Sequence, residues 1–444
     1  MKKILSLLLA CALTVSIVGC GKSTTGTSES GDSGTKTETT GGANGNGPVE
    51  LKMWVHVTDD TDEGKSYAER AAAFNEAHDD IKVTVEFIPR DGGGSGYEDK
   101  INTALTTNQL PDVITLDGPN TAAYVDAGIV APIDEYISKE SLDDYLPSIL
   151  QQGTVNGKLY ALGAMESSVA LFYNKDILAK YNIQPGTLDN PWTWDDLFEA
   201  AKTITEGEGY PALDMRFNDI GEWYIYAFAP FIWSNGGKII GEDGLTAEGI
   251  FNSPEAVEAL TFFKKLVDSG VVSVTPEENN FELGKSALYL NGPWAIPTLE
   301  NSYPDINFEA MPYPVSPKTK ELHVPTGSWQ YAVTAQSKHP AEAAKLVEWM
   351  TNTESVVSIT KAIGMPPARK SAVEFLPEYQ EGARKVLLDQ LAKGGHARPL
   401  SVIYPIISRN FQEAVEAVLY GDDPQTVLDE KVQVIEREAQ RYKK

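Results

Sequence analysis

Residues 160–176, YALGAMESSVALFYNKD, contain an apolar run that changes character halfway. Residues 159–165 are small or apolar, the polar residues Glu166, Ser167 and Ser168 interrupt the run, and residues 169–173 are apolar again. This pattern predicts two short buried strands joined by a polar crossing. Polar side chains in such a crossing belong in a cleft, whereas a bend in one strand of a single sheet is the alternative that this stretch alone leaves open.

Strands and helices alternate upstream of this crossing. Residues 50–57, 81–88 and 111–117 have strand patterns, and residues 66–78 and 100–107 between them have helix patterns. The alternation predicts a parallel sheet that is covered on both faces. Ligands bind beyond the carboxyl ends of such strands. We therefore expect five polar residues at the edge of a cleft, namely His56, Thr58, Asp59, Asp117 and Asn120.

Two motifs that flank the crossing resemble a known family. Residues 171–176, LFYNKD, and residues 192–197, WTWDDL, are similar to motifs of the extracellular solute-binding proteins of carbohydrate ABC transporters, the family of the maltose-binding proteins. The resemblance implies an α/β periplasmic-binding-protein fold of type II. This fold has two lobes, each a mainly parallel sheet flanked by helices, and hinge crossings between them.

In that family, the segment before the FYNKD motif is the first hinge crossing, so the resemblance implies that Glu166 and Ser167 face the ligand. Residues that match the position of Asp117 touch sugar hydroxyls in the family. Residues 327–333 are expected to form a second crossing, with Trp329 at the site, and a third crossing is expected after Arg369. The chain then divides into a first lobe of residues 49–164 and 327–378 and a second lobe of residues 165–326 and 379–444.

An aromatic cluster occupies residues 221–237, GEWYIYAFAPFIWSNGG. A buried helix is the plainer interpretation, and we expect Phe228 and Phe231 in the core. The polar atoms of Trp and Tyr need partners, so a dense cluster near a cleft is also a candidate for stacking on sugar rings. We assign Tyr226 and Trp233 to the ligand, together with Tyr224. The end of this segment also resembles the W-x-N-G-G turn of the family.

Residues 281–294, FELGKSALYLNGPW, carry the most specific resemblance. In the family, the NGPW tip of this strand presents an aromatic platform to the sugar, which makes Trp294 the first choice for stacking; a ring that caps the core is the alternative. Residues 364–369 resemble a turn whose Arg lies near the ligand, so Arg369 is a candidate, although a surface carboxylate could equally pair with it. A Trp that the family places near the start of the helix over residues 408–420 is absent, and Tyr404 is the nearest aromatic residue.

The amino terminus has the pattern of a secretory signal. Two lysines precede the apolar residues 4–18, which are too few for the roughly 20 that span a bilayer. Residues 17–20 resemble the bacterial lipobox, which implies lipidation of Cys20 after removal of residues 1–19. Residues 20–48 are rich in Gly, Ser and Thr and are expected to form a flexible tether. These features predict a protein anchored by lipid at the outer face of the cytoplasmic membrane; cleavage and free secretion are the alternative.

The composition excludes several functions. The 444-residue chain has 63 acidic and 37 basic residues and a net charge of −26, which argues against binding to nucleic acid. Its two cysteines include one in the signal, so no disulfide or cysteine metal site is expected. We expect no cofactor and no metal, a carbohydrate ligand, the transmembrane permease subunits of an ABC importer as partners, and a monomer.

Two other functions compete with that of a solute receptor. A secreted carbohydrate hydrolase could place two carboxylates, such as Glu166 and Asp117, on either side of a glycosidic bond. The family that the motifs resemble has no catalytic residues, which favours the receptor. A structural adhesin would not need such concentrated aromatic residues, and the sequence lacks repeats.

Overall fold

The computed structural model describes residues 47–90 and 96–443. Its first sheet has the strand order β2-β1-β3-β12-β6. The three strands of the predicted alternation run parallel, and the other two are antiparallel to their neighbours. The strands are β1 (Val49–Val55), β2 (Ile81–Phe87), β3 (Val113–Asp117), β6 (Ala161–Gly163) and β12 (Trp329–Val333).

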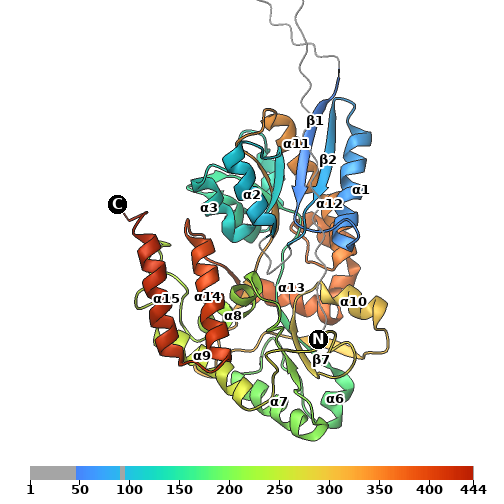
Figure 1. The fold of residues 1–444 in the computed structure, drawn as a ribbon. Coiled ribbons are helices and arrows are strands. Elements are labelled where there is room, and N and C mark those ends of the chain that lie inside the picture. Colours follow the sequence, from blue (N-terminus) through green and yellow to red (C-terminus); the bar gives the residue numbers. More distant parts are fainter. Residues whose placement is uncertain (1–46, 91–95, 444) are drawn as a thin grey trace, which may run out of the picture. The chain divides into compact units, whose positions relative to one another are not determined.

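Helices surround this sheet and form the first lobe with it (Figure 1). A cluster of apolar side chains, including Met53, Phe74 and Tyr331, fills the space between α1, α11, α12 and one face of the sheet. The helices are α1 (Asp62–Ala77), α2 (Gly96–Thr107), α3 (Thr121–Asp126), α4 (Lys139–Asp143), α5 (Pro147–Gly153), α11 (Pro340–Met350) and α12 (Thr353–Ile363).

A second sheet, of order β10-β7-β9-β8, forms the second lobe. Here the prediction of a mainly parallel sheet is wrong, because β7 is antiparallel to both neighbours and only β8 and β9 run parallel. A strand that enters from the other lobe needs no crossover helix within its own sheet, so its direction is not constrained to be parallel. The strands are β7 (Ala170–Asn174), β8 (Leu213–Asp214), β9 (Leu288–Asn291) and β10 (Phe308–Met311).

The helices of the second lobe surround the second sheet (Figure 1). The large apolar cluster there contains no residue from the helices of the first lobe. Two further strand pairs are β4 (Thr154–Val155) with β5 (Lys158–Leu159), and β11 (Val324–Thr326) with β13 (Gly395–Ala397). The helices are α6 (Lys175–Lys180), α7 (Trp194–Glu208), α8 (Glu222–Ser234), α9 (Pro254–Asp268), α10 (Ala295–Ser302), α13 (Gly382–Gly394), α14 (Tyr404–Leu419) and α15 (Pro424–Ala439).

The apolar run of residues 159–173 is divided between the two sheets. β6 belongs to the first sheet and β7 to the second, and residues 164–169 connect them. The polar interruption is therefore a crossing between the lobes. The alternative prediction, a bend in one strand of a single sheet, is wrong. Residues 327 and 328 make a second connection, between β11 and β12, as predicted.

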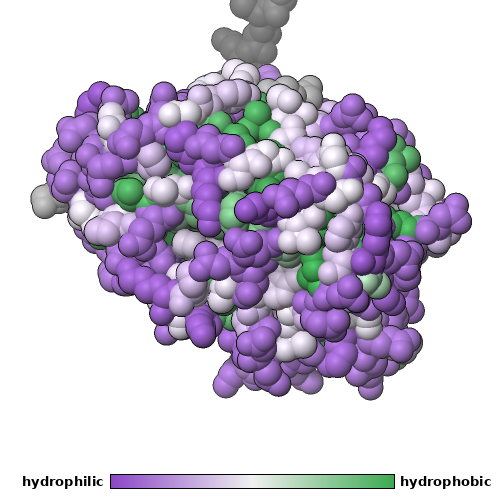
Figure 2. Space-filling view, turned by 90° about the horizontal axis from the view of Figure 1, so that it is seen from below, coloured by the Kyte–Doolittle hydropathy of each residue, from purple (hydrophilic) through white to green (hydrophobic). Residues whose placement is uncertain are grey.

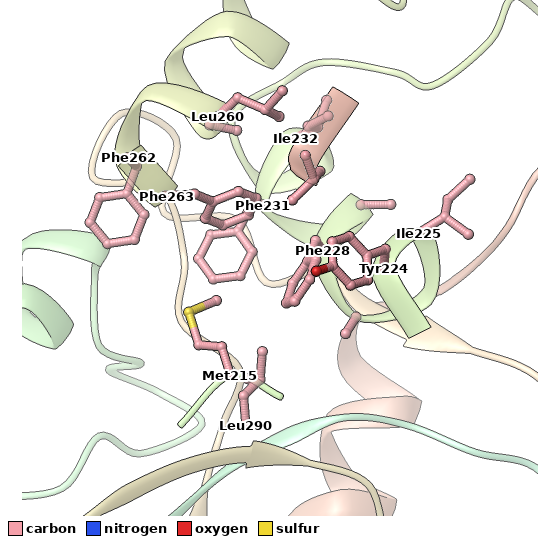
Figure 3. Packing of buried hydrophobic residues seen from close by; sticks show 14 of the residues in the cluster. Met215, Tyr224, Ile225, Phe228, Phe231, Ile232, Leu260, Phe262, Phe263 and Leu290 are labelled. Atoms are coloured by element: carbon pink, nitrogen blue, oxygen red, sulfur yellow. The ribbon is translucent and has the colours of Figure 1, made fainter. Parts of the chain in front are cut away.

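Helix α8 contributes the centre of the second core. Its residues are hydrophobic on all sides, which is typical of a buried helix. Phe228 and Phe231 have no exposed surface, as predicted. Figure 3 shows them packed beside Phe263 of α9, with Met215 and Leu290 below.

The outer surface is largely hydrophilic. On the face that Figure 2 shows, hydrophobic residues occur as separate small patches between hydrophilic ones. No helix within residues 47–90 and 96–443 combines the length and the apolar character that a membrane span requires. The predicted signal, Cys20 and nearly all of the tether lie outside the described residues.

Candidate ligand-binding cavity

Residues from both lobes line a cavity of about 650 Å³. This volume lies within the range of small-molecule sites. The first lobe contributes residues from the start of α1, the end of β3 and the start of β12, and the second lobe contributes residues from α8 and from the turn before α10. The lining includes Glu63, Arg90, Asp117, Ser167, Arg216, Asp219, Glu222, Trp223, Tyr226, Trp294, Gly327, Trp329 and Arg398.

Three aromatic rings form the wall that the second lobe contributes. Trp223 and Tyr226 lie three residues apart on α8 and therefore share one face of the helix. The ring centroid of Trp294 lies 6.2 Å from that of Trp223 and 6.3 Å from that of Tyr226. The half-buried Trp294 thus packs against the core on one side and borders the cavity on the other. The two predictions for this residue, a platform and a core cap, are compatible.

The wall of the first lobe carries Trp329, at the start of β12. His56 stacks under its ring, with centroids 3.4 Å apart and an interplanar angle of 7°. The guanidinium of Arg90 lies 5.2 Å from the ring centroid. Burial, and to a lesser degree Arg90, hold the pKa of His56 well below its usual value, so the imidazole is neutral. His56 therefore supports a cavity residue and does not line the cavity itself.

A buried ion network joins the two lobes beside the aromatic wall. Arg398 donates two hydrogen bonds to the carboxylate of Asp117, of 2.7 and 2.8 Å, and a third of 2.5 Å to Glu222. The hydroxyls of Tyr404 and Ser408 also donate to Glu222. Only 3% of the Arg398 side chain is exposed. Because a buried charge is costly without partners, this set stabilises the protein only as a complete network.

This network changes the role expected of two predicted residues. Asp117 lines the cavity, but both of its oxygens already accept hydrogen bonds from Arg398. Tyr404 is fully buried and bonded to Glu222, so it does not line the cavity in place of the absent Trp. Arg398 and Glu222 were missed because their function depends on contacts between residues 117, 222 and 398, which the sequence does not place together.

Two predicted aromatic residues lie away from the cavity. Trp233 is on the helix face of Tyr226 but seven residues further, about 10 Å along the axis, and it stacks on His396 at 4.1 Å. Tyr224 is two residues from Tyr226, which turns its ring to the opposite face. Its hydroxyl donates a hydrogen bond of 2.7 Å to the carbonyl of Phe217, and its ring lies in the core beside Phe228 (Figure 3).

Three polar residues that were predicted at the site also lie outside the cavity lining. Arg369 is buried in the first lobe, where it donates to Asp144, Tyr145 and Ser141; of the two alternatives for this residue, pairing with a carboxylate fits. Asp59 is exposed on the loop after β1 and does not line the cavity. Glu166 is 1% exposed and lies behind the cavity wall, where backbone amides surround it. Among the predicted residues, the structure brings together Trp294, Tyr226, Trp329, Asp117 and Ser167.

Charged groups in the lining are largely paired. Arg216 lies 4.6 Å from the ring centroid of Trp223 and forms an ion pair with Asp219, and Arg90 pairs with Glu98. Glu63 differs: burial raises the pKa of its carboxyl to about 7, although a hydrogen bond from Tyr67 opposes this shift. The described part of the chain contains no group of three or more His, Cys, Asp or Glu side chains arranged to hold a metal ion. The cavity therefore offers aromatic faces and neutralised polar groups.

Comparison with known proteins adds independent findings. Residues 58–357 match the family described as bacterial extracellular solute-binding protein. The crystal structure of the cyclic α-maltosyl-1,6-maltose binding protein of Arthrobacter globiformis is similar, with a TM-score of 0.74 and 25% identity, over 89% of this chain and 100% of that chain. This similarity places the chain among two-lobed proteins of the type II fold.

Two curated relatives align over most of their length. The galactooligosaccharide-binding protein of Bacillus subtilis is 22% identical over 401 residues, which are 88% of this chain and 86% of the relative. The diacetylchitobiose binding protein of Streptomyces coelicolor is 24% identical over 380 residues, 83% of each chain.

Proposed function

The chain belongs to the family of bacterial extracellular solute-binding proteins, and on this premise we propose that it captures an oligosaccharide between its two lobes and delivers it to the membrane permease of an ABC importer. The observation that carries the proposal is the cavity with Trp223, Tyr226 and Trp294 on one wall and Trp329 on the other. Aromatic faces suit the apolar faces of sugar rings, and nearby polar groups suit hydroxyls.

The anchor and the partners are part of the same proposal. Lipidation of Cys20 would hold the protein at the outer face of the cytoplasmic membrane, and the polar segment after it would let the two lobes reach the permease. The relatives' names support a saccharide ligand, because they include binding proteins for galactooligosaccharide and diacetylchitobiose. We propose a monomer without a cofactor.

A hydrolase is the alternative, and the geometry argues against it. The two carboxylates that would flank a glycosidic bond are both engaged: Asp117 binds Arg398, and Glu166 lies behind the wall and accepts backbone hydrogen bonds. Neither is free to donate a proton or attack a sugar carbon. We therefore propose that the cavity binds its ligand without changing it.

A thermal-shift screen of mono- and oligosaccharides tests the proposal. A saccharide at 100 times its Kd should stabilise the folded protein by about 2.7 kcal/mol. Chromatography of the same samples shows whether the sugar is recovered intact. If no saccharide raises the melting temperature, or if a bound sugar is cleaved, the proposed function is wrong.

A further inference from the structure

The first crossing is fixed to a different lobe on each side of Ser167. On one side, the backbone N–H of Glu166 donates to the carbonyl of Pro366 in the first lobe, at 2.8 Å. On the other side, the fully buried Gln390 of α13 donates to Ser168 Oγ at 3.0 Å and to the carbonyl of Val169 at 2.9 Å. Within this crossing, Ser167 is therefore the residue about which the two anchored segments can rotate relative to each other.

The second crossing is fixed in the same way around Gly327. The backbone N–H of Ser328 donates to Gln152 of the first lobe at 3.1 Å, and its carbonyl accepts from Gly118 at 3.0 Å. On the other side, Thr326 pairs with Ala397 in the small sheet of β11 and β13. Gly327 is thus the single residue between two anchored segments.

One carboxylate oxygen of Glu166 accepts hydrogen bonds from both Ser167 and Gly327. Glu166 Oε1 accepts from the backbone N–H of Ser167 at 3.0 Å and from that of Gly327 at 2.9 Å. Its other oxygen accepts from Gln152 of the first lobe at 3.3 Å. The Ser167 hydroxyl donates to the Gly327 carbonyl, which closes the connection between the two crossings. A carboxylate that is 1% exposed and bonded in this way is anchored firmly.

Ser167 and Gly327 both border the cavity. The hydroxyl of the cavity residue Tyr226 donates to Ser167 Oγ at 2.7 Å. A Cβ on residue 327 would lie 2.6 Å from Arg398 Nη2 and 3.2 Å from Cε2 of Tyr226, so the ion network and the aromatic wall approach this glycine closely.

We propose that Glu166 is a positioning residue for ligand capture: its carboxylate defines the axis on which the lobes rotate, and the hydrogen bond from Tyr226 to Ser167 couples occupancy of the cavity to that rotation. This inference rests on the proposed function. It also replaces the direct ligand contact and the catalytic role that the sequence suggested for Glu166.

The variants Glu166→Ala and Glu166→Gln test whether the Glu166 carboxylate positions the rotation axis or only stabilises the fold. Glutamine keeps a carbonyl oxygen for both backbone N–H groups, whereas alanine leaves both without an acceptor. A saccharide that stabilises the wild type serves as the ligand. We expect Glu166→Ala to weaken its binding at least tenfold and to change the ligand-induced decrease in radius of gyration. Glu166→Gln should restore most of both.

Glu436→Ala is the matched control. One oxygen of Glu436 also accepts two backbone hydrogen bonds, from Ala247 and Glu248, but all three residues lie in the second lobe away from the crossings. This variant should lower the melting temperature without changing affinity or closure. If Glu166→Ala behaves like this control, Glu166 is only a brace and the inference is wrong.

Tyr226→Phe separates coupling from stacking because it keeps the ring and removes the hydroxyl. We expect a severalfold loss of affinity and a smaller closure at saturating ligand, with a similar melting temperature. Unchanged affinity and closure would remove the coupling from the proposal.

Spin labels at the exposed positions Glu76 and Glu206, one in each lobe, distinguish failure of this inference from failure of the proposed function. In the ligand-free protein, Glu166→Ala should broaden the interlobe distance distribution and Glu166→Gln should not. This measurement needs no sugar. Equal distributions in the wild type and Glu166→Ala would refute the axis, whether or not a saccharide binds.

Discussion

Trp294 is the residue whose ring we expect to contribute most to ligand affinity. It borders the cavity, and the rings of Trp223 and Tyr226 hold it in place. Trp294→Ala should weaken saccharide binding by on the order of 1 to 3 kcal/mol, as the loss of other interface aromatics does. Calorimetric titration measures this, with Trp349→Ala, outside the cavity, as the control. Unchanged affinity in a folded variant would exclude Trp294 from the site.

Glu63 should make stability depend on pH. Its pKa in the folded protein is about 7, above the ordinary 4.5, so its contribution to the free energy of unfolding is full below pH 4.5 and is lost as pH rises through 7. Glu63→Gln cannot ionise. We expect urea denaturation to show the wild type losing stability relative to this variant between pH 4.5 and 7, with a constant difference above. A difference that does not vary with pH would contradict the raised pKa.

The sequence predicted three of the aromatic residues at the cavity, each from a different feature. The aromatic cluster of residues 221–237 predicted Tyr226, the NGPW tip predicted Trp294 and the second crossing predicted Trp329, and all three line the cavity. Tyr224 has the same chemistry, but its helix face directs it to the core. Which face of a largely apolar helix borders a cavity depends on the second core and on the other lobe, which no local pattern encodes.

At the scale of single elements, the capping box of α7 tests local stabilisation. Thr193 accepts a hydrogen bond from the backbone N–H of Asp196, and the Asp196 carboxylate accepts one from that of Thr193 in return. Thr193→Ala should lower the free energy of unfolding by roughly 0.5 to 2 kcal/mol. Thr193→Ser, which keeps the hydroxyl, is the control. A loss of equal size in both variants would show that the methyl group, and not the cap, matters.

Most elements were predictable because their signals are local. The capping box of α7, the Ser253 cap of α9 and the proline that begins α11 at residue 340 can each be recognised from a few neighbouring residues. Helix α14 begins at Tyr404, before the predicted residue 408. Its first turn is held by the buried bond from Tyr404 to Glu222, a long-range contact that helix periodicity does not reveal.

At the scale of the whole molecule, we expect the membrane association to depend on Cys20. A dually acylated cysteine would hold the protein firmly. Cys20→Ala should move the protein from the membrane fraction to the soluble fraction, with its saccharide affinity unchanged. Continued fractionation of the variant with membranes would contradict the lipid anchor.

The last prediction concerns the movement of the lobes. A ligand favours a closed form only if it contacts both lobes more fully there. The cavity meets this condition, because Trp329 belongs to the first sheet and Trp223 and Trp294 to the second lobe. The lobes are joined by the crossings at Ser167 and Gly327 and by a third connection between Tyr379, in the core of the first lobe, and Ala383 of α13 in the second lobe. Short connections of this kind permit hinge bending. We therefore expect small-angle scattering to show a smaller radius of gyration at saturating saccharide.

Trp294→Ala measured at the same free ligand concentration should close less often, and raising that concentration should restore the decrease, because the variant loses affinity and keeps the crossings. An enzyme with a preformed groove would show almost no change in either protein. An unchanged radius in the saturated wild type would thus count against capture by closure even if the saccharide binds tightly, since binding to one lobe alone gives affinity without any force that draws the second lobe in.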